Sequence, residues 1–167
     1  MHRLRMILLL LAALLPIRVS AADSLCLAGE QIVFSCRIAN SSNQVALCAA
    51  AQLDETGWLL YRFGVPGKIA LEFPEKRGGS LQRFGFKHYM RYQTDYTDIT
   101  FNIGKTQYSV YDYYQGEEKP AYARGVRVTS ETGKETDLPC RGKVKSDLLK
   151  LEGLLPCTDP EDGAGCK

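Results

Sequence analysis

Three carboxylates and one histidine are the side chains of this sequence that could support acid–base chemistry. Asp112, Glu117 and Glu118 offer the pair of carboxyl groups that a glycoside hydrolase places on either side of its cleft. Adjacent glutamates in a strand or loop tend to point apart, however, and charged side chains are usually exposed. His88 is the only histidine beyond residue 2, and it would have to serve alone as the base for a serine or cysteine nucleophile. We therefore expect no catalytic residues, with a carboxylate-based hydrolase as the less favoured alternative.

Six cysteines predict disulfide bonds rather than a metal site. They are Cys26, Cys36, Cys48, Cys140, Cys157 and Cys166. No two of them have the CxxC spacing and only one histidine accompanies them, so we expect neither a metal nor another cofactor. Six cysteines allow fifteen pairings. One pairing follows from geometry, because a hairpin centred on Ser42 would place Cys36 opposite Cys48. The pairing of the other four stays open.

The N-terminal segment has the pattern of a secretory signal peptide. Basic residues at positions 3 and 5 precede the apolar run 7–15, and small residues follow at 19–22. We expect residues 1–22 to be the signal peptide, residues 23–157 to form a single domain, and residues 158–167 to be a polar tail. The expected location is the periplasm, with the extracellular medium as an alternative, and no membrane anchor is expected.

The charge balance of the exported part argues against two classes of partner. The whole chain has 21 basic and 19 acidic residues. Removing Arg3, Arg5 and Arg18 with the signal peptide leaves 18 basic residues against 19 acidic ones, a net charge of about −1. A chain of this overall charge has no basic field that would attract nucleic acid or anionic lipid.

The rest of the sequence is dominated by strand-like alternation of apolar and polar residues. The clearest segments are 59–63, 69–73, 99–103, 108–111 and 126–128, separated by turns rich in glycine, proline and asparagine. About eight such strands predict an all-β antiparallel sandwich or barrel-like fold. A single short helix is expected over Lys145–Leu151, with Ser146 as its cap.

The segment 112–123 is predicted to be a long, polar and tyrosine-containing loop between two strands. Tyrosines offer rigid amphipathic contact area, so a loop of this kind on a rigid scaffold favours recognition. The residues that we expect to bind a partner are Asp112, Tyr113, Tyr114, Gln115, Gly116 and Glu117, with Tyr89 or Tyr92 nearby. Among the remaining tyrosines, Tyr108 shares the face of Val110 and is expected in the core, whereas Tyr111 and Tyr113 share the opposite face.

The order of these segments resembles a known family. LLYRFG, GKIALEFP, a tyrosine-rich strand, ITFNIG, YSVYD, a loop, GVRV and a late LPC follow one another between Trp58 and Cys140. This order is similar to that of bacterial periplasmic lysozyme inhibitors, above all the inhibitors of invertebrate-type lysozyme. The resemblance implies a β-sandwich or barrel-like protein that pushes a loop into the active-site cleft of the lysozyme. The loop that matches by position is 112–118, where the family has a Ser-Gly pair followed by an aromatic residue and this chain has Asp-Tyr-Tyr-Gln-Gly.

Two kinds of binding protein are compatible with these features. The favoured one is an inhibitor of lysozyme or of another cell-wall hydrolase, acting by steric occlusion. The alternative is a periplasmic immunity protein that protects against the cell-wall toxin of a rival, since it would need the same disulfide-bonded scaffold and exposed loop.

Overall fold

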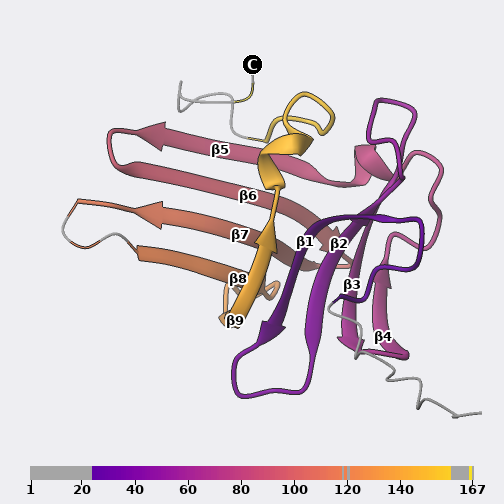
Figure 1. The fold of residues 1–167 in the computed structure, drawn as a ribbon, viewed down its shortest axis with the longest axis horizontal. Coiled ribbons are helices and arrows are strands. Elements are labelled where there is room, and N and C mark those ends of the chain that lie inside the picture. The colour runs from indigo at the N-terminus through magenta and orange to yellow at the C-terminus, as the bar shows by residue number, and fades with distance from the viewer. Residues whose placement is uncertain (1–23, 118, 120, 159–165, 167) are drawn as a thin grey trace, which may run out of the picture.

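The computed structural model describes residues 24–117, 119, 121–158 and 166, and nine strands dominate them (Figure 1). The strands are β1 (Gln31–Ile38), β2 (Gln44–Ala49), β3 (Leu59–Val65), β4 (Lys68–Phe73), β5 (Gly85–Arg91), β6 (Thr94–Ile103), β7 (Thr106–Gln115), β8 (Ala121–Thr129) and β9 (Glu135–Ser146). Two 3-10 turns accompany them, η1 (Ser80–Arg83) and η2 (Leu148–Leu151). The all-β antiparallel fold is confirmed, with nine strands where about eight were expected. The expected signal peptide, residues 1–22, lies outside the described residues, as does most of the expected tail.

All nine strands belong to one sheet, in the order β4-β3-β2-β1-β9-β8-β7-β6-β5, which curls into a half-barrel. The sheet turns at β9, because residues 135–139 of this strand pair with β8 while residues 140–146 pair with β1. Figure 1 shows the consequence: β5–β8 run across the picture and β1–β4 run down it. The two halves therefore face each other across one inner surface.

The hydrophobic core lies on this inner surface and joins the two halves. Phe101 of β6 is near its centre, with its ring centroid 4.9 Å from that of Tyr61, 4.8 Å from that of Phe73 and 5.1 Å from that of Tyr108. Tyr61 and Phe73 come from β3 and β4, whereas Tyr108 comes from β7, where it shares the inner face with Val110 as expected. Each such side chain stabilises the fold by roughly 1.5–3 kcal/mol through burial.

The C-terminal segment closes the open side of the half-barrel. Leu148, Leu151 and Leu155 are buried in the core. Beyond them the backbone meets the edge of β5, where the Phe86 amide donates to the Pro156 carbonyl at 2.8 Å. The outer strand β5 is thereby tied to the end of the chain.

The expected helix over Lys145–Leu151 is wrong, because its first residues belong to β9. Lys145 pairs with Ser35 and Ser146 with Phe34, and the Asp147 amide donates to the Val33 carbonyl at 2.8 Å. Only four residues then remain for η2, too few to repay the cost of nucleating an α-helix. The ladder with β1 therefore prevails over the helical spacing of the leucines.

The disulfide expected between Cys36 and Cys48 is also wrong. The bonds are Cys26–Cys48, Cys36–Cys140 and Cys157–Cys166. The hairpin of β1 and β2 exists, but its register places Cys36 opposite Val45, and Ile32 opposite Cys48. In addition Cys36 belongs to the core on the inner face, whereas Cys48 packs with Leu25 and Ala46 on the outer face.

Three disulfides among six cysteines indicate an exported protein in a non-reducing compartment. No helix in the described part of the chain has the length and apolar character needed to cross a membrane.

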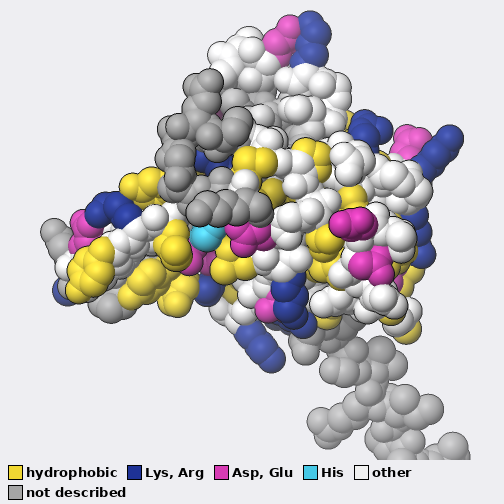
Figure 2. Space-filling model, turned by 90° about the horizontal axis from the view of Figure 1, so that it is seen from above, with side chains coloured by type: hydrophobic (Ala, Val, Ile, Leu, Met, Phe, Trp, Pro, Cys, Tyr) yellow, Lys and Arg dark blue, Asp and Glu magenta, His cyan; other side chains and the backbone are white. Residues whose placement is uncertain are grey.

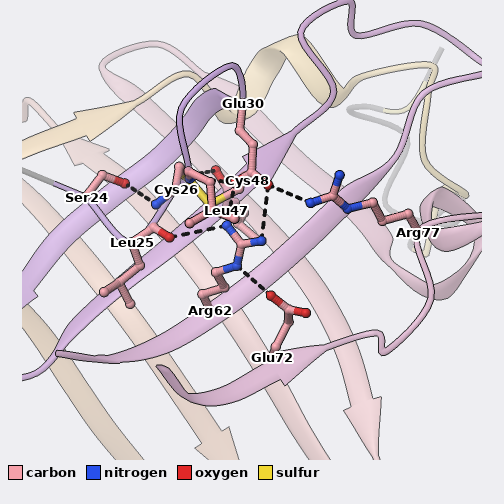
Figure 3. A network of polar contacts seen from close by, with 10 residues as sticks. Ser24, Leu25, Cys26, Glu30, Leu47, Cys48, Arg62, Glu72 and Arg77 are labelled. Atoms are coloured by element: carbon pink, nitrogen blue, oxygen red, sulfur yellow. Dashed lines mark hydrogen bonds and ion pairs between the residues drawn. A yellow bond between two sulfur atoms is a disulfide. The ribbon is translucent and has the colours of Figure 1, made fainter. Parts of the chain in front are cut away.

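The outer face of β2 and β3 is covered by the N-terminal residues 24–30, and a buried arginine holds them in place (Figure 3). The Arg62 side chain is only 2% exposed, and it forms ion pairs with Glu30 and Glu72 and donates to the Leu25 carbonyl at 3.2 Å. Glu30 itself is 5% exposed and also accepts from Arg77 at 2.9 Å. Burial opposes the charge of Glu30, but hydrogen bonds from Arg62 and the Leu27 amide, together with the charges of Arg62 and Arg77, keep the pKa of Glu30 below its usual value.

Candidate functional site

The strands β5–β8 extend beyond β9 and form one end of the sheet. β9 pairs only with residues 125–129 of β8, so the first part of β8 and the adjoining parts of β5–β7 continue without it (left in Figure 1). We call the described residues of 88–97 and 112–124 the distal end. It contains all the residues that the sequence marked for recognition and that the structure describes.

The expected loop 112–123 is mostly strand, which corrects its boundaries. β7 continues to Gln115 and β8 begins at Ala121, leaving residues 116–120 as the connection. Asp112, Tyr113, Tyr114 and Gln115 all pair with β6 on one side and with β8 on the other. Two complete ladders fix their backbone, which is why a polar segment remains extended here.

Because of this extended backbone, the six expected recognition residues do not lie on one surface. Asp112 and Tyr114 point to the inner face, and Tyr113 and Gln115 to the outer face. Gly116 and Glu117 follow at the tip. Each of these residues therefore belongs to a surface formed with its cross-strand neighbours on the same face.

On the inner face, polarity and exposure change row by row toward the tip. The row through Ile99, Val110 and Val126 is fully buried core. The next row consists of His88, Thr97, Asp112 and Arg124, and the last consists of Met90, Asp95, Tyr114 and Tyr122. The core thus gives way first to charged groups and then to large exposed side chains.

The ionisable side chains of the middle row each have a partner. The Arg124 Nε donates to Asp112 Oδ1 at 2.7 Å, and the Arg124 guanidinium lies 4.0 Å above the ring of Tyr122. The His88 Nε2 lies 3.1 Å from Asp95 Oδ1. Asp112 is therefore paired with an arginine, which lies across from it on β8.

The last row exposes an unusual amount of apolar surface. Tyr122 is 62% exposed, Met90 61%, and Tyr92 in the adjoining turn 83%. Leu149 of η2, 47% exposed, faces the same region and lines a depression of about 330 Å³ together with Asp95, Tyr114 and Tyr122. Figure 2, which looks onto the β5 edge, shows hydrophobic side chains gathered at this end, on the left.

The two turns at the tip are fastened to each other. The Gly116 amide donates to the Gln93 carbonyl at 2.7 Å, and Arg91 forms an ion pair with Glu117 at 2.5 Å. Both contacts join the β5–β6 turn to the β7–β8 connection. The tip is thereby pre-organised, although Arg91 and Glu117 are each about half exposed.

The outer face of the distal end carries a second set of tyrosines, which are held by partners. The rings of Tyr89, Tyr96, Tyr113 and Tyr111 contact one another in sequence, with centroids 6.2, 4.8 and 5.0 Å apart. The Tyr113 hydroxyl donates to Asp98 at 2.9 Å, and the Tyr96 hydroxyl donates to Gln115. Burial, followed by the charge of Asp98 and this hydrogen bond, raises the pKa of Tyr113. Tyr113 and Gln115 thus stabilise the sheet and are not free to reach outward.

Sequence reasoning missed three residues of the inner surface: Met90, Tyr122 and Leu149. Tyr122 could have been found, because a short β7–β8 connection places it opposite Tyr114. Met90 and Leu149 carried no sequence signal. Only the fold leaves Met90 exposed, and only the fold brings Leu149 of η2 next to the distal end.

A cluster of metal-ligand types among the described residues belongs to the other half of the sheet. Ligand atoms of Cys26, Glu30 and Cys48 lie within 4.8 Å of one another. The two sulfurs are joined in a disulfide, so neither is available as a thiolate.

Comparisons with known proteins place the chain in no family. No family model, curated protein or solved structure with which it was compared matches it.

Proposed function

We propose that this protein is an exported protein-binding module that docks through the inner face of its distal end, and that its partner is a cell-wall hydrolase of the lysozyme type. The observation that carries the proposal is the position of its exposed apolar side chains. Of the six large hydrophobic residues that are exposed in the described part of the chain, Met90, Tyr92 and Tyr122 lie at this one end, and Leu149 lines the depression beside them. Tyrosine, methionine and arginine are the residues in which the centres of protein interfaces are enriched.

The geometry suits occlusion of a cleft. The distal end projects beyond β9 as a narrow part of the sheet, and its two turns are fastened by the Gly116 amide and by the Arg91–Glu117 pair. An element that is already ordered loses less conformational entropy on binding. Flat rings such as Tyr92 and Tyr122 can occupy positions that a sugar ring takes in a lysozyme cleft.

The disulfides and the N-terminal segment support a periplasmic location for this function. A protein in that compartment meets the enzymes that degrade the cell wall. The resemblance in segment order suggests a lysozyme as the target, and the distal end is the surface that we propose binds it.

The hydrolase alternative receives less support. Asp112 is paired with Arg124 and Glu117 with Arg91, while Glu118 lies outside the described residues. The His88 Nε2 lies 3.1 Å from Asp95 Oδ1. Replacement His88→Ala should accordingly leave inhibition almost unchanged, whereas an enzyme that depends on this residue would lose turnover by orders of magnitude.

The direct test is inhibition of purified lysozymes of the invertebrate, chicken and goose types. The protein is produced by export, so that its disulfides form. We expect inhibition of at least one type at micromolar concentration. In the variant Tyr92→Ala/Tyr122→Ala, inhibition should weaken by roughly thirtyfold, because truncating a central aromatic anchor costs about 2 kcal/mol.

A matched control comes from the same class of residue elsewhere. Leu27 and Ile69 are exposed by 56% and 39% and lie outside the distal end. The variant Leu27→Ala/Ile69→Ala should inhibit as the unmodified protein does. If the unmodified protein slows none of the three lysozymes, the proposed target is wrong, and an immunity function against a bacterial cell-wall toxin becomes the alternative to test.

A further inference from the structure

A basic depression lies on the outer face of the sheet where β1 meets β9, away from the distal end. Its volume is about 640 Å³. It is lined by Ile32, Ser35, Cys36, Arg37, Arg141, Gly142, Lys143 and Lys145. Four of these eight residues are cationic, and none of them is acidic.

An irregularity in the ladder concentrates the charges. Arg37 pairs with Arg141 and Ser35 with Lys145, so three residues of β9, 142–144, lie opposite Cys36 alone. Gly142 adopts a φ of 69° in this bulge, a conformation that a side chain would strain. The bulge compresses Arg141, Lys143 and Lys145 into a short length of sheet beside Arg37.

The charges are not compensated by the fold. Like charges directly opposite each other in a ladder are destabilising, and Arg37 and Arg141 are such a pair. Among the residues that the structure describes, no carboxylate forms an ion pair with Arg37, Arg141 or Lys143, whereas Lys145 reaches Asp147 only at 3.9 Å. A chain of net charge near zero thus places four cations around one depression.

The backbone beneath the two arginines is rigid. Arg37 directly follows Cys36, and Arg141 directly follows Cys140, and these two cysteines are joined in a disulfide with Cα atoms 5.7 Å apart. The Arg141 Nη2 also donates to the Ser41 carbonyl at 3.4 Å. A covalent bond therefore fixes the spacing of two guanidinium-bearing residues that repel each other.

From this arrangement we infer that the depression binds a phosphate group. A phosphate ester offers up to two negative charges and several acceptor oxygens, which suits two arginines and two lysines better than a single carboxylate does. Arginines bind phosphate through paired N–H donors, and the lysines add charge at the rim. The phosphate can belong to a small soluble ester or to the headgroup of an anionic lipid, which have this chemistry in common.

The test measures thermal unfolding and binding of inorganic phosphate and glycerol phosphate to the exported, disulfide-bonded protein. Phosphate should raise the Tm more than chloride at equal ionic strength, because a ligand that binds only the folded state stabilises it. In the variant Arg37→Gln/Arg141→Gln the Kd for phosphate, measured by calorimetry, should rise at least tenfold. The control Lys68→Gln/Lys76→Gln removes two exposed charges elsewhere and should bind phosphate as the unmodified protein does.

The stability of the free protein gives a second readout. In phosphate-free buffer of low ionic strength, Arg37→Gln/Arg141→Gln should have a Tm equal to or above that of the unmodified protein, since a repulsive pair is removed. A lower Tm would show that the arginines serve the fold, and would overturn the inference. Equal responses of the unmodified protein to phosphate and chloride, without binding of phospholipid, would also overturn it.

Sedimentation with vesicles identifies the source of the phosphate. Vesicles of phosphatidylglycerol are compared with vesicles of phosphatidylcholine, which has no net charge. Binding to phosphatidylglycerol vesicles that is lost in the double arginine variant supports a lipid headgroup; binding of soluble phosphate alone supports a small ester. The variant Tyr92→Ala/Tyr122→Ala should retain phosphate binding, so the inference stands or falls separately from the lysozyme proposal.

Discussion

The two ends of the sheet use the same antiparallel ladder but are held together by different means. The half formed by β1–β4 and β9 contains the bonds Cys26–Cys48 and Cys36–Cys140 and the buried pair of Arg62 with Glu30. The distal end has no cysteine in its sequence. It is held by tyrosine ring contacts and by ion pairs that remain partly exposed, such as Arg91–Glu117.

This difference indicates that one half of the sheet stabilises the fold and that the distal end exposes side chains for binding. The disulfides stabilise the half formed by β1–β4 and β9, and loss of either partner of its buried pair would leave an uncompensated charge. The exposed rings of Tyr92 and Tyr122 add little to folding, because most of their surface stays in water. A rigid scaffold of this kind allows one end of the protein to keep apolar side chains uncovered for a partner.

The largest expected effect comes from the disulfide that joins β1 to β9. Cys36 and Cys140 are separated by 104 residues, and closing a loop of that length restricts the unfolded chain. Replacement by alanine at both positions should lower the free energy of unfolding by roughly 5 kcal/mol, as measured by urea denaturation.

Its control is the short-range bond between Cys157 and Cys166, with a separation of 9 residues. The corresponding double alanine variant should lose roughly 3 kcal/mol or less. An equal loss in the two variants would contradict the view that the first half holds the main covalent constraint.

The buried arginine is expected to have the next largest effect. Arg62→Met leaves the Glu30 carboxylate buried without its main partner, which should cost roughly 3–5 kcal/mol of unfolding free energy. The double variant Arg62→Met/Glu30→Gln should recover part of this loss, because position 30 then no longer carries a buried charge without its main partner. A double-mutant cycle with strictly additive losses would show that the two residues do not act as a pair.

Periodicity was sufficient to predict an all-β fold and the two faces of β7, but not the end of β7, the strand β9 or the pairing of the cysteines. The alternation of Tyr108 and Val110 against Tyr111 gave the inner and outer faces correctly. The disulfides depend on the exact hairpin register, in which Cys36 meets Val45, and on a register shift between Ile32 and Phe34. Neither is visible in a pattern with a period of two, where a small shift moves a side chain to the other face.

The candidate sites show the same limit. The sequence directed attention to Tyr113 and Tyr114 as neighbours, yet strand geometry separates them onto opposite faces. The basic residues of 141–145 were not singled out, because a net charge near zero gave no reason to do so. Only the fold brings Arg37 opposite Arg141, from a strand more than a hundred positions earlier in the chain.

A fall in pH should lower the free energy of unfolding by protonating Glu30, which lies in the half formed by β1–β4 and β9. Because its pKa in the folded state lies below the ordinary value of 4.5, the ion pair contributes fully above that pH and is lost as the pH falls through the folded-state pKa. We expect the difference in unfolding free energy between the unmodified protein and Glu30→Gln to be largest at pH 7 and to shrink toward pH 3. A difference that is constant over this range would contradict a charged Glu30 in the folded state.

The smallest effect distinguishes the two faces of the distal end. Tyr113→Phe removes the hydroxyl that donates to both oxygens of Asp98 at 2.9 Å. Asp98 keeps its hydrogen bond from Ser109, so the loss should be about 1–2 kcal/mol of unfolding free energy. Tyr92→Phe, at a position 83% exposed, should leave the stability unchanged.

Binding by the same set of variants then tests which face meets the partner. Replacing Tyr113 and Tyr114 together would confuse the faces, because it removes a stabilising outer ring and an inner contact at once. Tyr113→Phe alone should retain inhibition of the lysozyme, whereas Tyr114→Ala should weaken it, since Tyr114 lines the inner depression beside Tyr122. If Tyr113→Phe loses inhibition while remaining folded and Tyr114→Ala does not, the docking surface lies on the outer tyrosine row, and the exposed inner side chains need another explanation.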